Sequence, residues 1–403
     1  MELAIGLQTL LVAAVVSAAA PLLVAWLPGP RIPQVVVLLA GGVLVGPQVL
    51  GWADQPSINL LANVGLGFLF LLAGYELDLK LFEERPGRLA IVGWLLTLAL
   101  AAATVGALAA AGLVRAFVPV ALGLTTTALG TLLPILRDND MLGGRFGRYL
   151  LAAGAVGELF PIFAIALFLG ASNKFVALAS LAAVGVLAAV LGLAPRLVRG
   201  TGLGRILRES EGSTSQTAVR LTVLLLLFLL VVAEEFGLDV VLGAFLAGIV
   251  LRRWAPGDVH SLEGKLDAIG YGFFIPLFFV FSGMGLDIRS IAEAPLRLVA
   301  FFVLLLVIRG VPALFLYRRV LPAVQRVEMM FLTATALPLL VALAEIGLRN
   351  GTMLRENAAA LVGAGALSVL VFPMTAVTIE RRRRAREGVG DPASLPRSPP
   401  VPP

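Results

Sequence analysis

Thirteen apolar stretches, each near the length of a membrane-spanning helix, occupy most of this chain. The hydrocarbon core of a bilayer is about 30 Å thick, and a helix needs roughly 20 apolar residues to cross it. We therefore predict an all-α polytopic membrane protein with about thirteen transmembrane helices. The predicted spans are residues 4–27, 33–51, 58–75, 89–113, 117–136, 149–170, 175–195, 217–236, 238–254, 267–285, 296–317, 328–347 and 357–378.

Composition and the placement of basic residues agree with this assignment. Of the 403 residues, 59% are hydrophobic and 14% are charged, whereas about a quarter of a soluble domain is charged. If the N-terminus lies outside, most of the 31 Lys and Arg fall on the cytoplasmic side, as the positive-inside rule requires. We expect a multi-pass protein of the plasma membrane with a cytoplasmic C-terminus. The formal charge of +6 comes from residues in short loops, so we expect the lipid bilayer, and no nucleic acid, as partner.

The chain is predicted to hold one membrane transport domain at residues 1–378, with a polar linker at 196–220. Residues 379–403 form a basic, Pro-rich segment that we expect to be a disordered cytoplasmic tail. There is no Cys, and the one His, His260, lies in a predicted loop, so thiol chemistry and a zinc site of the usual ligands are not expected. We predict a protein that is not an enzyme and has no cofactor.

Short fragments of the first half recur in the second half. The offsets lie between 207 and 209 residues and contain seven predicted spans, an odd number. The second copy must therefore enter the membrane from the opposite side, which predicts two inverted-topology repeats at about 30–170 and 238–378. The matching fragments are LAG at 39–41 and 246–248, GYELD at 74–78 and GMGLD at 283–287, and LTTTAL at 124–129 and LTATAL at 332–337.

Two corresponding spans are interrupted by polar and helix-breaking residues. Each contains a proline, which leaves one carbonyl without its helical hydrogen bond. We expect both helices to break and cross at mid-membrane, where carbonyl ends and hydroxyls favour a cation. The alternative is that the threonines donate to carbonyls within intact helices. The interrupting residues are Thr125, Thr126, Thr127, Gly130 and Pro134 in the first span, and Thr333, Thr335 and Pro338 in the second.

The span at 149–170 is apolar except for one acid, Glu158. A lone charge at mid-membrane costs about 3 kcal/mol on insertion scales, so such a residue is interpreted first as functional. Pro161 cannot donate to the Gly157 carbonyl, and carboxylate and carbonyl together would form a site for a monovalent cation. A carboxylate binds a proton as well, so the two ligands would compete at Glu158. The alternative is a structural acid that a neighbouring base neutralises or that burial keeps protonated.

A second charge, Arg309, lies deep in a span of the second repeat. At this depth the side chain cannot easily reach either surface. Neither Glu158 nor Arg309 has a charged counterpart in the other repeat. We therefore predict that the acid and the base pair with each other across the pseudo-symmetric core.

Seven segments carry a resemblance to a known family: RIPQVVVLLAGGVLVGP, FLFLLAGYELDLKLF, LTTTALGTLLP, GAVGELFPI, VVLGAFLAG, FFIPLFFVFSGMGLDI and IRGVPAL. In this order they resemble the monovalent cation:proton antiporter-2 family, the Kef-type Na+/H+ or K+/H+ exchangers. The resemblance covers about residues 30–375. It implies a dimer-forming domain and a core domain that moves as a unit, and hence a homodimer. It also implies that Glu158 and Arg309 stand where the family keeps its ion-carrying acid and partnering base.

This chain departs from the family at one position. Many relatives carry two adjacent polar residues where this chain has Gly157 and then Glu158. With a single carboxylate, we predict electroneutral one-for-one exchange of Na+ or K+ for protons. A sodium-coupled organic-solute symporter of similar inverted-repeat fold is the main alternative, and a passive channel is another. An intramembrane aspartyl protease would need two carboxylates on facing spans, and here an arginine stands opposite the acid.

Overall fold

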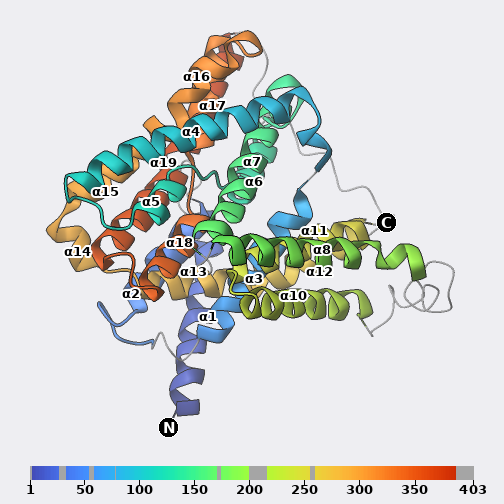
Figure 1. Ribbon diagram of the computed structural model, residues 1–403. Helices are drawn as coiled ribbons and strands as arrows, with labels where there is room; N and C mark the ends of the chain where they lie inside the picture. Colours follow the sequence, from blue (N-terminus) through green and yellow to red (C-terminus); the bar gives the residue numbers. More distant parts are fainter. Residues whose placement is uncertain are drawn as a thin grey trace. The chain divides into compact units, whose positions relative to one another are not determined.

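The computed structural model describes residues 2–26, 33–53, 59–77, 79–169, 174–198, 216–254 and 259–386, in which helices and turns but no strands occur (Figure 1). The α-helices are α1 (Glu2–Trp26), α2 (Gln34–Val45), α3 (Asn59–Glu76), α4 (Arg85–Ala110), α5 (Phe117–Gly123), α6 (Leu129–Asp138), α7 (Gly144–Phe168), α8 (Lys174–Val198), α10 (Thr217–Glu235), α11 (Val240–Trp254), α12 (Val259–Ile269), α13 (Ile275–Met284), α14 (Ile288–Glu293), α15 (Pro295–Leu304), α16 (Val311–Leu316), α17 (Ala323–Ala334), α18 (Pro338–Arg349) and α19 (Arg355–Arg386). Short 3-10 turns, η2 (Leu79–Phe82) and η5 (Tyr317–Arg319), and π-helical turns, η3 (Gly270–Phe274) and η4 (Leu305–Gly310), complete the described elements.

The predicted all-α membrane class is confirmed. In the described stretches, ten helical segments are long and apolar enough to cross a membrane. The predicted spans at 33–51, 117–136 and 238–254 correspond to the shorter helices α2, α5 with α6, and α11. The count of thirteen therefore stays a prediction. Of the linker predicted at 196–220, residues 199–215 lie outside the described part of the chain.

The chain divides into two compact units, and each unit combines segments from both halves of the sequence. The first unit comprises Met1–Asp78 and Ile162–Ser290, and the second comprises Leu79–Pro161 and Ile291–Pro403. The division falls within α7, after its internal proline. The repeats predicted at 30–170 and 238–378 are therefore not separate bodies, because both contribute helices to each unit.

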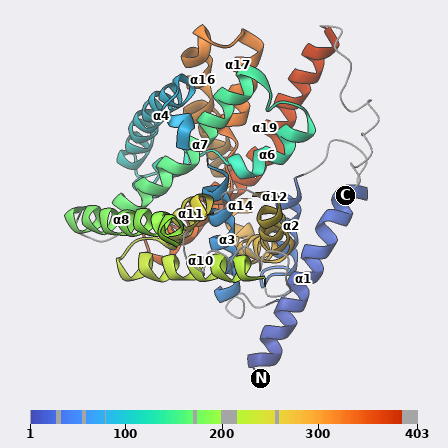
Figure 2. The same ribbon diagram turned by 90° about the vertical axis from the view of Figure 1, so that its right-hand side faces the viewer.

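In the first unit, α2 packs against α13, and α3 packs against α11, while α8 and α10 lie along α11 (Figures 1 and 2). Glycines allow the backbones to meet, as is typical of helix pairs in membranes. In the α2 and α13 pair, a Cβ on Gly42 would collide with the Val280 carbonyl, and one on Gly283 with the Leu39 carbonyl. Side chains at these two glycines would force the helices apart.

The α3 and α11 pair meets in the same way. Here a Cβ on Gly74 would collide with the Phe245 carbonyl, and one on Gly248 with the Leu71 carbonyl. The contacts of the two pairs correspond residue by residue. Each α2 residue matches the α11 residue 206 positions later, and each α3 residue matches the α13 residue 209 positions later. By this packing the counterpart of Gly248 is Gly42, whereas the LAG match aligned Gly248 with Gly41. Sequence identity could not choose between two adjacent glycines.

In the second unit, α4 packs against α5 and α16, and α17 and α18 pack against α19. Two of its spans are interrupted. The chain leaves helical geometry at residues 124–128, between α5 and α6, and at residues 335–337, between α17 and α18. Both interruptions fall in the spans that the sequence predicts to be broken.

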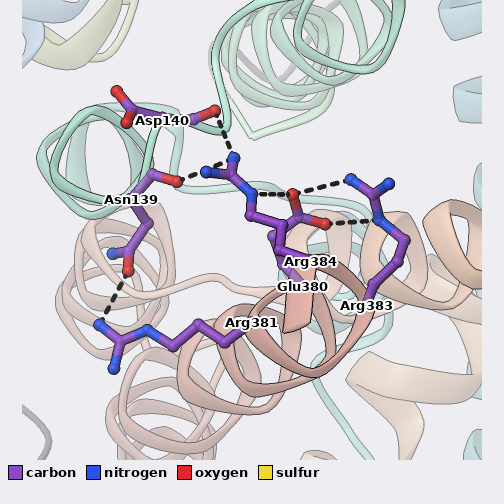
Figure 3. Close-up of polar contacts among 6 residues, drawn as sticks. All are labelled: Asn139, Asp140, Glu380, Arg381, Arg383 and Arg384. Atoms are coloured by element: carbon purple, nitrogen blue, oxygen red, sulfur yellow. Dashed lines mark hydrogen bonds and ion pairs between the residues drawn. The ribbon is translucent and has the colours of Figure 1, made fainter. Parts of the chain in front are cut away.

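A polar cluster fastens the end of α19 to the segment after α6 (Figure 3). The carboxylate of buried Glu380 accepts hydrogen bonds from Arg383 at 2.8 and 2.9 Å and from Arg384 at 2.6 Å. Arg384 also donates to the Asp140 carbonyl at 2.9 Å and to the Asn139 carbonyl at 3.3 Å. These contacts explain why α19 continues to Arg386, beyond the predicted end at 378. Residues 379–386 are thus helical rather than disordered, and 387–403 lie outside the described part.

Substitution of Glu380 by Ala is expected to lower stability by about 2 kcal/mol, because it removes a buried carboxylate that accepts charge-assisted hydrogen bonds from two half-buried arginines. Glu356 is the matched control, since its ion pair with Arg297 is exposed, with 44% and 47% of the two side chains accessible. Exposed pairs contribute less than about 1 kcal/mol, so Glu356→Ala should change little. Thermal unfolding of the purified variants in detergent measures both. Equal shifts for the two variants would contradict the role assigned to Glu380.

Candidate functional site

The two interrupted spans of the second unit cross at their breaks. The Ala128 N–H donates to the Thr335 carbonyl at 2.8 Å, and the Thr127 hydroxyl donates to the Thr333 carbonyl at 2.6 Å. A broken helix in a membrane must satisfy its released backbone groups internally. Here donors of the first broken span pair with backbone carbonyls of the second, so each break depends on the presence of the other.

The five predicted threonines are all buried at this crossing. Four of their hydroxyls donate to a carbonyl three or four residues earlier, as the alternative interpretation expected, yet both helices are broken. A hydroxyl that donates one hydrogen bond still has lone pairs that can accept or coordinate. The four back-bonded hydroxyls belong to Thr125, Thr126, Thr333 and Thr335, with acceptors at Leu122, Gly123, Met329 and Phe331.

The two breaks differ in their relation to proline. Pro338 is the first residue of α18 and directly follows its break, where a missing N–H is best tolerated. Pro134 instead lies inside α6, after the break at 124–128 has ended. Gly130 belongs to the first turn of α6, and a Cβ there would meet open space. The threonine-rich segment, rather than Pro134 or Gly130, therefore forms the first break.

Ser368 of α19 is a site residue that the sequence analysis missed. Its buried hydroxyl accepts the Ala336 N–H at 3.0 Å, inside the second break. The same hydroxyl lies 2.9 Å from the Ala336 carbonyl and 2.7 Å from the Gly365 carbonyl, and it can donate to one of them at a time. A single hydroxyl in the otherwise apolar stretch 358–374 of α19 was the available signal.

Arg309 occupies the π-helical turn η4 and is 5% exposed. Its Nε donates to the Thr127 hydroxyl at 2.9 Å, and its Nη2 donates to the Ala153 carbonyl of α7 at 2.9 Å. Because the Thr127 hydroxyl also donates to the Thr333 carbonyl, the guanidinium is connected to both breaks and to α7. Single π-helical turns occur often at functional sites, and here the turn places the charge at the crossing.

Glu158 and Gly157 lie on α7, which is continuous although it contains Pro161. The Gly157 carbonyl, which we expected to be free for a cation, accepts the Thr127 N–H at 3.0 Å. The reason is that the break leaves this N–H without a helical partner, and the carbonyl freed by Pro161 is its neighbour. One lone pair of the carbonyl remains for a further ligand. Glu158 is half-buried next to it, and its ion pair with Arg309 stays a prediction.

The second unit thus brings one acid, one base and two helix breaks into a single neighbourhood. Carboxylate, carbonyl and hydroxyl oxygens suit a hard cation, and the carboxylate also binds a proton. In the described part of the chain, no group of three or more His, Cys, Asp or Glu is placed to hold a metal ion. Any cation site here would therefore be built from Glu158 with carbonyl and hydroxyl oxygens.

Known proteins resemble the chain over most of its length. The family described as sodium/hydrogen exchanger, transmembrane, matches residues 9–380. The putative Na(+)/H(+) antiporter YjbQ of Bacillus subtilis is 27% identical over 391 residues, which are 88% of this chain and 60% of YjbQ. The Na(+)/H(+)-K(+) antiporter GerN of Bacillus cereus is 27% identical over 267 residues, which are 65% of this chain and 67% of GerN. The chain therefore spans only part of the length of these relatives.

A solved structure has a similar fold. The sodium proton antiporter MjNhaP1 from Methanocaldococcus jannaschii aligns with a TM-score of 0.64 at 16% identity, over 97% of this chain and 99% of that one. The predicted antiporter-2, Kef-type subtype is narrower than the family that matches. The matching family and the relatives named above are membrane transporters, not enzymes. From these matches and its apolar helices, the chain is a multi-pass membrane protein that belongs to the sodium/hydrogen exchanger family.

Proposed function

We propose that this chain is a secondary active antiporter that exchanges Na+ or K+ for protons and uses Glu158 as the shared carrier. The observation that carries the proposal is the position of Glu158 on α7. It directly follows Gly157, whose carbonyl accepts the Thr127 N–H of the first break. Arg309 donates to the same threonine. The only acid of this span therefore directly follows the residue that contacts the first break, and the buried base and Thr333 of the second span both contact the same threonine.

Exchange follows from competition at one carboxylate. A proton forms a covalent bond to a carboxylate oxygen and removes the charge that holds a cation, so the two ligands exclude each other. The second lone pair of the Gly157 carbonyl and the hydroxyls of Thr125 and Thr126 are the further oxygens proposed to coordinate the cation. Arg309 supplies a fixed positive charge near the crossing, and we propose that it balances Glu158 when neither ligand is bound.

The proposed architecture is thirteen spans in two inverted repeats. The ten long helical segments would be completed by α2, α11 and the pair α5 and α6. Two observations support the repeats: the matching contacts of the glycine pairs in the first unit, and the breaks at 124–128 and 335–337 in the second. We further propose a homodimer of the Kef type in the plasma membrane, with the N-terminus outside. These points rest on the resemblance and on the positive-inside pattern.

Substitution of Glu158 by Gln is expected to reduce cation-dependent proton flux to the level of protein-free liposomes. The reason is that an amide does not take up and release a proton and supplies no negative charge to hold a cation. Proteoliposomes with Na+, K+ and Li+ tested in turn measure this and give the selectivity. Glu356→Gln is the control, since Glu356 forms an exposed ion pair outside the site. Exchange retained by the Glu158 variant would remove the central assignment, and sodium-dependent solute uptake without exchange would favour the symporter.

One-for-one exchange is expected to be insensitive to voltage. A step that moves one net charge across the membrane gains or loses about 2.3 kcal/mol per 100 mV, so an electrogenic exchanger would respond strongly. The test is sodium-driven proton flux in proteoliposomes with an imposed diffusion potential of either sign. Flux that rises with one sign and falls with the other would show a different stoichiometry.

Substitution of Arg309 by Ala is expected to lower stability by about 3 kcal/mol, because it removes the buried group that connects Thr127 to α7. It should also change the pH dependence of exchange, since the proposed carrier loses a neighbouring positive charge. Arg297→Ala is the control, because Arg297 is exposed in its pair with Glu356. Thermal unfolding and the pH profile of flux are both needed. An unchanged melting curve together with an unchanged profile would count against the assigned role.

A further inference from the structure

Gly157 faces the guanidinium of Arg309 directly. A Cβ built on Gly157 would overlap Arg309 Nη2, and it would lie 2.6 Å from Thr127 Oγ1 and 2.9 Å from Thr127 Cβ. Cβ atoms in real structures essentially never have a non-bonded heavy atom of another part of the chain under 3.0 Å away. The guanidinium therefore fills the space that the side chain of any other residue at position 157 would need.

The guanidinium is held in this space by directed hydrogen bonds. Nη2 donates to the Ala153 carbonyl, one helical turn before Gly157 on the same face of α7, and Nε donates to Thr127. Both bonds are 2.9 Å long, and the side chain is buried. We call Ala153, Gly157 and Thr127 together the Arg309 seat. A side chain at 157 could enter the seat only if the guanidinium left it.

We propose that Gly157 is a positioning residue whose missing side chain creates the seat for Arg309 and so fixes a positive charge beside the carrier acid. The proposal rests on the proposed role of Glu158. It gives a physical meaning to the glycine that this chain has where many relatives have a polar residue.

The competing explanation is that Gly157 only allows α7 to approach the first break. The Thr127 N–H bond to the Gly157 carbonyl brings the two backbones together in any case. Under that explanation a methyl group at 157 should lower stability by the same amount whether or not Arg309 is present. Under the proposal the loss of stability should depend on Arg309. A double-mutant cycle separates the two.

The first arm of the test measures thermal unfolding of Gly157→Ala, Arg309→Ala and the double variant in detergent. Gly157→Ala is expected to lower the melting midpoint. The loss should be clearly smaller in the Arg309→Ala background, where the overlap with the guanidinium is gone and only the close contact with Thr127 remains. Gly106→Ala is the control, because its Cβ would meet only Phe117 at an ordinary 3.7 Å. Equal losses from Gly157→Ala in both backgrounds would overturn the proposal. If Gly157→Ala fails to fold, the double variant is compared with Arg309→Ala instead. A double variant that folds and melts close to Arg309→Ala supports the seat, and one that does not fold although Arg309→Ala does overturns it.

The second arm measures sodium-driven proton flux of Gly157→Ala at alkaline pH, where protons compete least with Na+. The displaced guanidinium has the same sign of charge as Na+, so moving it away from the carrier carboxylate should lower the apparent KM for Na+. The decrease is about tenfold if 1.4 kcal/mol of repulsion between Arg309 and Na+ is relieved. A folded variant with unchanged KM and pH profile would overturn the proposal. If the natural chain shows no exchange, the proposed function fails while the unfolding cycle still decides the seat. If exchange depends on Glu158 but the cycle shows no coupling, the seat fails and the function stands.

Discussion

The crossing of the two broken helices depends on Thr127. Its N–H donates to the Gly157 carbonyl, its hydroxyl donates to the Thr333 carbonyl, and the same oxygen accepts from Arg309. Inside a membrane no water is available to satisfy backbone groups that a helix break releases. One threonine satisfies groups from the other broken helix, from the unbroken α7 and from the buried base. Without it, the break, the charge and α7 would each need another partner.

The sequence predicted the helical class and the two interrupted spans, because long apolar runs and clusters of threonine and proline are local signals. It named the threonines of the first break but could not choose between them and the nearby Gly130 and Pro134. The choice depends on contacts with Thr333 and Thr335, more than 200 residues away in the chain. A proline inside a helix did not locate it either, since α6 continues through Pro134. The end of α19 was missed for a similar reason, because the acceptor Glu380 and the carbonyl of Asp140 become neighbours only in the folded chain.

The sequence could identify most candidate site residues, but it could not show which residues they contact. A lone acid and a lone base in apolar spans are visible in the sequence, and so Glu158 and Arg309 could be named. The role of Gly157 was only half visible, because Pro161 identifies its carbonyl but nothing local shows that a guanidinium fills the place of its side chain. Ser368 carried a visible signal, yet its contact with Ala336 crosses from α19 to the second break, 32 residues earlier in the chain. A polar residue in an apolar run can therefore be recognised from the sequence as a candidate site residue, but its contacts depend on how the helices pack.

The charges at the crossing also bear on what one cycle of the proposed exchange would move. If Arg309 stays positive, the site with an empty carboxylate is neutral, and it carries one positive charge with either a proton or a monovalent cation bound. The two loaded forms then have the same charge, so their opposite passages across the membrane cancel. A second carboxylate at position 157 would change this balance, and the space for its side chain is already filled by the guanidinium. The missing side chain of Gly157 thus gives room to the base and leaves none for a second acid, and this packing supports the proposed one-for-one stoichiometry.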